Sequence, residues 1–273
     1  MTAPERRIRS RGYFDFLRDG LYAVLRTIAR HASGFYTAFG IFLVVGAALA
    51  TACTLLFVAF AGRVRSGTTQ AFDEGVLTWM AAHRVWWLER SLVEITALGT
   101  GMVVMAIVAV AALFLYLTEH RYSSFLLLLA SGGGIILNTI LKLSYDRPRP
   151  QIFEWVTNVS SSSFPSGHAM SAAIVYSTVA YLAARLQKNR WARVTTMLIS
   201  FLVIILICAS RLYLGVHYPS DVLAGVIIGL AWAAFCMAGL EAVQVFAKRF
   251  RAPALEHERD LDPGEREAAG LTQ

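Results

Sequence analysis

Residues 160–170 read SSSSFPSGHAM, and this stretch decides how the rest of the chain is interpreted. A serine run, a proline–serine–glycine turn and His168 stand directly before a long apolar segment. Polar groups at the edge of a membrane helix cost free energy unless they line a cavity or take part in chemistry. The stretch therefore predicts a polar site at one end of a helix, which needs partners of matching chemistry elsewhere in the chain.

Two other polar stretches supply such partners. Residues 142–150, KLSYDRPRP, end the preceding apolar segment, and residues 210–221, SRLYLGVHYPSD, end the following one. In a chain that crosses a membrane, the three stretches are expected to meet on the same side.

The composition is that of an integral membrane protein. The 273 residues are 56% hydrophobic and only 16% charged, whereas soluble domains carry about a quarter charged residues. The net charge of +7 does not indicate nucleic-acid binding, because the basic residues stand at the ends of apolar segments and form no continuous patch. The three cysteines lie inside apolar runs, so we expect buried thiols and no disulfide framework.

Six apolar segments are long enough to cross the ~30 Å hydrocarbon layer. They predict an all-α fold, a polytopic bundle of six transmembrane helices that occupies residues 35–247. The expected spans are residues 35–61, 92–117, 123–143, 168–184, 194–211 and 222–247. Glycines inside these spans are expected to let helices approach closely and not to bind phosphate; they are Gly132, Gly133, Gly134, Gly225 and Gly229.

Three segments outside the spans have characters of their own. Residues 1–34 are rich in arginine and carry apolar residues at helical spacing, which predicts an amphipathic helix on the membrane surface or on the cytoplasmic face of the bundle. Residues 62–90 contain three tryptophans and predict short interfacial helices, which form either a lipid entrance or an inert belt. Residues 248–273 are highly charged and are expected to be a partly disordered tail.

The distribution of basic residues predicts that both termini are cytoplasmic. The arginine-rich start does not resemble a secretory signal. Most of the 25 lysines and arginines then lie at the ends and loops placed inside, as the positive-inside rule requires. The three polar stretches are therefore expected at the outer face of a cytoplasmic membrane.

The groups in the three stretches suit a phosphate. A phosphate favours several cations, hydroxyl and backbone donors and the positive end of a helix. Each group alone has an ordinary explanation, such as a cation that reaches the headgroups or a serine that caps a helix; their convergence does not. The candidate phosphate ligands are Lys142, Arg149, Ser166, Gly167 and Arg211.

The histidines indicate a reaction and not binding alone. His217 and Asp221 are four residues apart and share a face if the helix begins near Pro219. The carboxylate can then hold one imidazole nitrogen as N–H and leave the other as a nucleophile. His168, on another helix, can protonate the leaving oxygen and later activate water.

Two expectations concern metal ions and Arg147. Two histidines and an aspartate are also common zinc ligands, but the surrounding lysine and arginines would repel a divalent cation, so we expect no metal and no other cofactor. Arg147 ranks below the other cations, because it stands beside Asp146 and is able to form an interfacial ion pair with it.

The motif positions resemble those of the PAP2 superfamily, the type 2 phosphatidic acid phosphatases. Lys142, followed after six intervening residues by Arg149-Pro150, is similar to the first family motif. Residues 165–168 (PSGH) are similar to the second, and Ser210-Arg211 with His217 and Asp221 to the third. The resemblance implies a PAP2/chloroperoxidase-like core and metal-independent catalysis. It also implies that His217 is the nucleophile, Asp221 its orienting group and His168 the general acid, with phosphate bound by Lys142, Arg149, Ser166, Gly167 and Arg211.

The resemblance further implies a membrane lipid phosphatase that acts on phosphatidic acid, phosphatidylglycerol phosphate or undecaprenyl diphosphate. One alternative is a phosphotransferase that uses the same phosphoenzyme, for example in lipid A modification. Another is a non-catalytic binder or transporter of lipid phosphates, which the two histidines and Asp221 disfavour because binding needs only the cations. The expected partners are the lipid substrate and the surrounding membrane lipids, and not nucleic acid.

Overall fold

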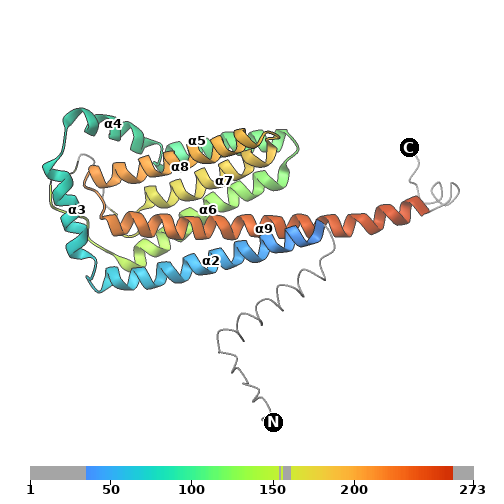
Figure 1. The fold of residues 1–273 in the computed structure, drawn as a ribbon, viewed down its shortest axis with the longest axis horizontal. Helices are drawn as coiled ribbons and strands as arrows, with labels where there is room; N and C mark the ends of the chain where they lie inside the picture. The colour runs from blue at the N-terminus through green and yellow to red at the C-terminus, as the bar shows by residue number, and fades with distance from the viewer. Residues whose placement is uncertain (1–34, 154, 156–160, 261–273) are drawn as a thin grey trace, which may run out of the picture.

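The computed structural model describes residues 35–153, 155 and 161–260, and in this part of the chain it is built from helices without strands (Figure 1). The predicted amphipathic helix in residues 1–34 lies outside the described residues. The helices are α2 (Phe35–Arg65), α3 (Gln70–Ala82), α4 (Trp86–Ala97), α5 (Gly101–Leu117), α6 (Arg121–Tyr145), α7 (Gly167–Leu186), α8 (Arg190–Tyr213) and α9 (Pro219–Asp260).

The membrane-spanning helices confirm the predicted polytopic all-α bundle. Five helices are long and apolar enough to cross a membrane, namely α2, α6, α7, α8 and α9. Helices α4 and α5 pass the same test together and are bent by 45° at their junction, so the total is six if this pair is one span.

The predicted continuous helix over residues 92–117 is wrong, because residues 98–100 interrupt it between α4 and α5. A Cβ atom on Gly99 would lie 2.8 Å from Cγ2 of Ile207 and 3.1 Å from Cδ2 of His168. The break therefore brings the backbone at Gly99 against α7 and α8, at a distance that no side chain would allow.

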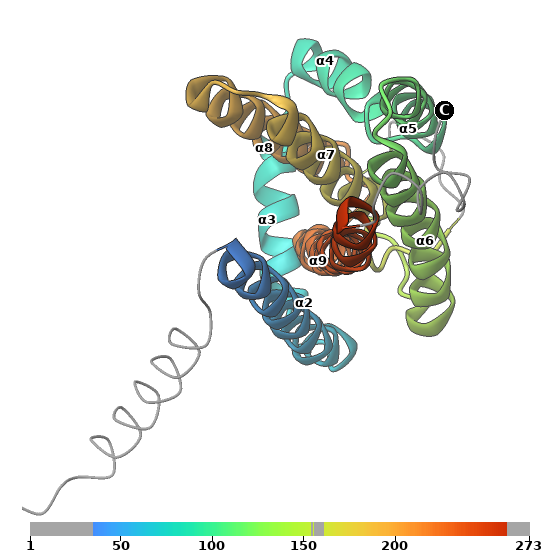
Figure 2. The same ribbon diagram turned by 90° about the vertical axis from the view of Figure 1, so that its right-hand side faces the viewer.

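Helices α7 and α9 form the centre of the bundle. In the end-on view of Figure 2, α9 lies between α2 and α7, and these neighbours are its main packing partners. More of the apolar stretch is buried in α7, at 56%, than in α2 or α8, at 17% each. The outer helices leave most of their surface to the membrane, as expected for spans that face lipid.

Small residues allow the close approach of α7 and α9. A Cβ atom on Gly225 would lie 2.7 Å from the carbonyl oxygen of Ser166, and one on Gly229 would lie 2.8 Å from that of Met170. Gly133 and Gly134 similarly make room for Trp232 and Ile174. The predicted packing role is confirmed for these four glycines, whereas Gly132 has no neighbour within 4 Å.

The segments between and after the predicted spans are also partly helical. Short helices α3 and α4 both lie at the end of the bundle opposite to the extension of α9 (Figure 1). Short helices were expected for residues 62–90, and their place in the membrane interface stays a prediction. The expectation of partial disorder from residue 248 stays a prediction. Helix α9 continues to Asp260 and so includes residues 248–260. This stretch is rich in lysine, arginine, alanine, leucine and glutamate, which have high helix propensity.

The cysteine side chains are largely buried, and helix α3 has one buried and one exposed face. The three cysteines are free, with Cys208 and Cys236 buried and Cys53 partly buried. On α3, Asp73 and Leu77 face the bundle and are fully buried, while Phe72 and Trp79 are exposed on the other side. Helix α3 is thus amphipathic, with an acid on its inner face.

A Gly229→Ala substitution is expected to destabilise the protein. The new methyl group would meet the Met170 carbonyl oxygen and the Ala173 side chain, and such overpacking costs about 1–3 kcal/mol. The measurement is the melting temperature in detergent. Gly132→Ala is the control, since a methyl group there meets nothing within 4 Å. Equal melting temperatures for the two variants would contradict the packing role of Gly229.

Candidate active site

The predicted site residues gather at one end of the bundle. They come from the C-terminal ends of α6 and α8, the N-terminal ends of α7 and α9, and the connections before α7 and α9. The backbone N–H of Ser166 donates to the carbonyl oxygen of Asp221 over 3.0 Å, which joins the starts of α7 and α9 directly. The three polar stretches therefore form one site, as the sequence predicts.

Arg149 lies buried at the centre of this site. Its Nη1 donates to the carbonyl oxygen of Val216 over 2.6 Å, and its Nε donates to that of Ser161 over 2.7 Å. The same Nη1 lies 3.2 Å from Nε2 of His217. Two backbone carbonyls hold the Arg149 side chain in place, and its guanidinium group contacts the ring of His217.

His217 is 2% exposed, and its two ring nitrogens face different groups. Guanidinium groups only donate, so Nε2 beside Arg149 must be the acceptor and the proton belongs on Nδ1. Burial lowers the pKa of His217 to about 4, although the nearby Asp221 carboxylate acts in the opposite direction. The ring is therefore neutral near pH 7 and keeps a lone pair on Nε2.

Ser163 connects His217 with Asp221. Nδ1 of His217 lies 3.4 Å from Oγ of Ser163 and 3.6 Å from Oδ2 of Asp221. The Ser163 hydroxyl donates to the same Oδ2. Because its oxygen remains able to accept from Nδ1–H, Ser163 can link the ring to the carboxylate. The sequence contains Ser163 within the serine run, but nothing distinguishes it there from its neighbours.

Two buried polar atoms of the site have no hydrogen-bond partner within the described residues. They are Nε of Arg211 and Oγ of Ser166. Arg211 is 3% exposed and donates through Nη1 to Oγ1 of Thr96 over 2.9 Å. Ser166 is the N-cap residue of α7, yet its hydroxyl makes no capping bond. An anion bound between these side chains would supply the missing acceptor.

Lys142 and Gly167 complete the predicted phosphate ligands. Lys142 donates to the carbonyl oxygen of Ser162 over 2.9 Å and to Oγ of Ser161 over 3.0 Å. Gly167 begins α7, and a Cβ atom there would lie 3.2 Å from Oδ1 of Asn138 and 3.8 Å from Cε of Lys142. The start of α7 thus lies close to the lysine, as anion binding at a helix N-terminus requires.

His168 stands in the first turn of α7 and is half-buried. The ionisable groups that act on it electrostatically are Arg211, His217, Lys142 and Arg149. The structure therefore brings this second histidine to the same cluster as the first, from a different helix.

Arg147 has a different role from the one expected from the sequence. It makes no ion pair with Asp146; it donates to Oδ1 of Asp221 over 2.6 Å and to Oδ2 of Asp73 over 2.9 Å. Asp146 adopts a left-handed conformation with φ of 38°, so the chain turns between the two neighbours. Asp73 and Thr96 were not anticipated as site residues, although Asp73 shares the inner face of α3 with Leu77.

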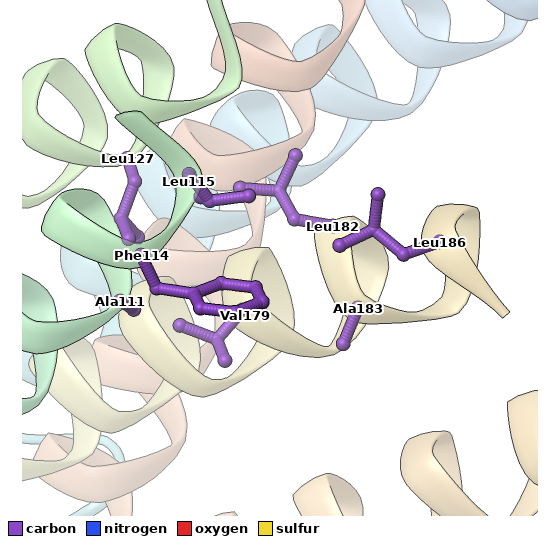
Figure 3. Close-up of a pocket in the computed structure, with 8 residues that line it drawn as sticks. All are labelled: Ala111, Phe114, Leu115, Leu127, Val179, Leu182, Ala183 and Leu186. Carbon is purple, nitrogen blue, oxygen red and sulfur yellow. The ribbon is translucent and has the colours of Figure 1, made fainter. Parts of the chain in front are cut away.

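Metal ligands and cavities add nothing to this cluster. Within the described ranges, no group of three or more His, Cys, Asp and Glu side chains is arranged to hold a metal ion. Figure 3 shows a hollow between α5, α6 and α7 that is lined only by apolar side chains, including Phe114, Leu182 and Leu186. It lies toward the Leu186 end of α7, away from Gly167, and offers no group that could bind a phosphate.

The sequence of this chain is similar to those of known proteins. Residues 121–244 match the family model described as the PAP2 superfamily. A phosphatidylglycerophosphatase B of Bacillus subtilis is 32% identical over 180 residues, which cover 64% of this chain and 87% of that protein. The chain belongs to the PAP2 superfamily. The resemblance expected from the three motifs is thereby confirmed.

Structural comparison also supports the PAP2 fold. The crystal structure of the first transmembrane PAP2 type phosphatidylglycerolphosphate phosphatase from Bacillus subtilis matches with a TM-score of 0.68 and 29% identity, over 71% of this chain and 96% of that one.

A second sequence relative is an undecaprenyl-diphosphatase of Sulfolobus acidocaldarius, which is 29% identical over 139 residues. That match covers 49% of this chain and 63% of the relative.

The protonation state of His217 can be tested without a substrate. With burial lowering the pKa to about 4, the ring is expected to be neutral and protonated on Nδ1 at pH 6, where an ordinary histidine is largely charged. Side-chain ¹⁵N chemical shifts of the protein in detergent report both properties, and His217→Gln identifies the signal. A charged ring at pH 6, or a proton on Nε2, would contradict the geometry.

Proposed function

We propose that this PAP2 protein is a membrane lipid phosphatase that removes phosphate from a lipid phosphomonoester or diphosphate through a phosphohistidine on His217. The observation that supports this most directly is the surrounding of His217 Nε2. This nitrogen is an acceptor 3.2 Å from Arg149, in a cluster where Arg211 Nε and Ser166 Oγ are buried without partners among the described residues.

Binding of the phosphate uses the cations and the start of α7. Arg149 and Arg211 hold phosphate oxygens with their planar guanidinium groups, and Lys142 adds a compact charge. Ser166 Oγ and the N-terminal amides of α7, beginning at Gly167, complete the set. Because Arg149 already touches Nε2, a phosphate on this arginine lies within reach of the nucleophile.

In the first step, Nε2 of His217 attacks phosphorus while the bond from phosphorus to the lipid oxygen breaks. The negative charge of the bound phosphate offsets the neighbouring cations, so His168 carries a proton in the complex. It gives this proton to the lipid oxygen, and the lipid leaves as an alcohol or, from a diphosphate, as a lipid monophosphate. The ring of His217 becomes positively charged, and Asp221 stabilises this charge through Ser163 and Nδ1–H.

In the second step, neutral His168 takes a proton from water, and the oxygen of that water attacks the phosphohistidine. The phosphorus–nitrogen bond breaks and inorganic phosphate leaves. His217 returns to its neutral form and His168 to its charged form, so the cycle closes. The cations supply the electrostatic stabilisation that a metal ion provides in other phosphatases, and we propose that the reaction needs no metal.

The substrate class follows from the position of the site and from the relatives. The site lies at the ends of spanning helices, at the depth where lipid phosphates are found. A phosphatidylglycerophosphatase B is the relative matched over 87% of its own length, so phosphatidylglycerol phosphate is the first substrate to test. Undecaprenyl diphosphate, suggested by the archaeal relative, and phosphatidic acid are the next.

The purified protein is expected to release inorganic phosphate from at least one of these three lipids with a chelator present. His217→Gln is expected to reduce the rate by at least ~10³-fold, because no other side chain replaces the nucleophile. His168→Gln is expected to lower the rate as well, because it removes both the proton donor of the first step and the base of the second. His120→Gln, an exposed histidine at the opposite end of α6, is the control and should match the parent.

The products distinguish the proposal from its alternatives. Phosphate found on a second lipid, with none released, would make the protein a phosphotransferase. Equal rates for the parent and His217→Gln would contradict the phosphohistidine mechanism, and loss of activity with the chelator would contradict metal independence.

We also propose that the site faces the outside of a cytoplasmic membrane, with both chain termini in the cytoplasm. Support comes from the other end of the bundle, where the α7–α8 connection carries Lys188 and the first turn of α8 carries Arg190 and Arg193. Basic residues in short loops are retained on the cytoplasmic side.

The orientation is tested with single cysteines in a chain that lacks Cys53, Cys208 and Cys236. A membrane-impermeant maleimide added to intact cells is expected to label Thr68→Cys, which is exposed at the site end. Lys188→Cys, exposed at the other end, should react only after the cells are lysed. The reverse pattern would place the site in the cytoplasm.

A further inference from the structure

A buried row of charges runs from the short helix α3 to Asp221. Arg147 donates through Nη2 to Oδ2 of Asp73 over 2.9 Å and through Nη1 to Oδ1 of Asp221 over 2.6 Å. Both carboxylates are 0% exposed. One guanidinium group therefore bridges two acids that belong to helices α3 and α9.

Asp73 also holds the beginning of α9. Its Oδ1 accepts from the backbone N–H of Ser220 over 3.0 Å, and its Oδ2 accepts from Oγ of Ser220 over 2.5 Å. Ser220 directly precedes Asp221 in the first turn of α9, where a negative charge is favourable. The carboxylate of α3 thus fixes the turn that carries Asp221.

The two oxygens of Asp221 have separate partners. Oδ1 accepts from Arg147, while Oδ2 accepts from Oγ of Ser163 and from the backbone N–H of Tyr218 over 2.9 Å and faces Nδ1 of His217. Arg147 therefore grips the oxygen that points away from the histidine. Without it, Oδ1 would lose this partner, and only the bonds from Ser163 and Tyr218 to Oδ2 would orient the carboxylate.

We propose that Asp73 and Arg147 are positioning residues for the phosphatase reaction, which set the orientation and the charge of Asp221 and so of His217. Helix α3, which does not span the membrane, is then part of the catalytic apparatus. Neither residue contacts the phosphate. The proposal rests on the proposed role of His217 as the nucleophile.

The simpler explanation is that the row only ties α3 to the bundle. Buried ion pairs are weak evidence of a net stabilising role, because desolvation offsets much of their attraction. Loss of stability alone cannot separate the two explanations, since any break of a buried pair destabilises a protein. The two explanations differ in how a change of charge should affect His217.

The three side chains together carry one negative charge, and substitutions change it in opposite directions. Arg147→Gln leaves two carboxylates near His217, which favours the charged ring. Asp73→Asn leaves a neutral pair, which favours the neutral ring. The other ionisable groups that act on His217 stay the same in every variant; they are Arg149, Arg211 and His168.

The experiment measures phosphate release as a function of pH for the purified parent and variants. Each single substitution is expected to lower kcat by about 10–100-fold, the cost of a slightly misplaced reacting group, with KM within about threefold of the parent because the phosphate ligands are untouched. The acidic limb of the profile should move to higher pH in Arg147→Gln and to lower pH in Asp73→Asn. The double variant should return it toward the parent.

Controls separate this proposal from failure of the proposed function. Asp146→Asn removes an exposed carboxylate beside Arg147 and should behave as the parent. If Arg147→Gln does not fold, Arg147→Lys serves instead, since one ammonium keeps the charge but cannot bridge both acids in the same geometry; kcat should fall and the limb should stay. An inactive parent would refute the proposed function. An active parent whose variants lose only melting temperature, with kcat and the acidic limb unchanged, would overturn the positioning role.

Discussion

The confinement of several positive charges around one neutral imidazole is the constraint on which the rest of the site depends. Lys142, Arg149 and Arg211 repel one another, and burial away from water strengthens that repulsion. The protein offsets it with backbone carbonyls, since the oxygens of Ser161, Ser162 and Val216 accept from two of the cations. A bound anion such as the proposed phosphate would add the negative charge that the cluster lacks.

This constraint explains why the connection before α7 follows the path it does. Ser161 and Ser162 bind cations through their carbonyl oxygens, and Ser163 turns its hydroxyl to Asp221. Three consecutive serines therefore contact groups of opposite charge, two of them cations and one a carboxylate. The close approach of α7 to α9, which Gly225 permits beneath the Ser166 carbonyl, then brings this connection against the start of α9. Packing inside the membrane and chemistry at its surface are fixed by the same contact.

The sequence predicted the parts of the site that lie close to the three motifs. The polar ends of consecutive spans must meet on one face of the membrane, so Lys142, Arg149, His168, Arg211 and His217 could be placed together from spacing alone. The break at Gly99 was missed, although the residues Gly99, Thr100 and Gly101 are a turn signal. The close approach of Gly99 to Ile207 and His168 could not be predicted, because only the folded chain contains it.

Arg147 was misinterpreted for a related reason. Its neighbour Asp146 is the nearest acid in the chain, but the left-handed turn at that residue separates the two side chains. The real partners, Asp73 and Asp221, are each 74 residues away, in opposite directions along the chain. Spacing within a motif carries no information about such contacts.

Helix α3 brings these observations together. Its outer face exposes Phe72 and Trp79, side chains that favour the membrane interface, while its inner face buries Asp73 against Arg147. The inner face of α3 is tied to the bundle by Arg147 and Ser220, so a shift of this helix would disturb Asp221. A lysine would satisfy one of the two acids, whereas the planar fork of arginine satisfies both at once. The choice of arginine at position 147 therefore follows from the need to hold an interfacial helix and a buried carboxylate with one side chain.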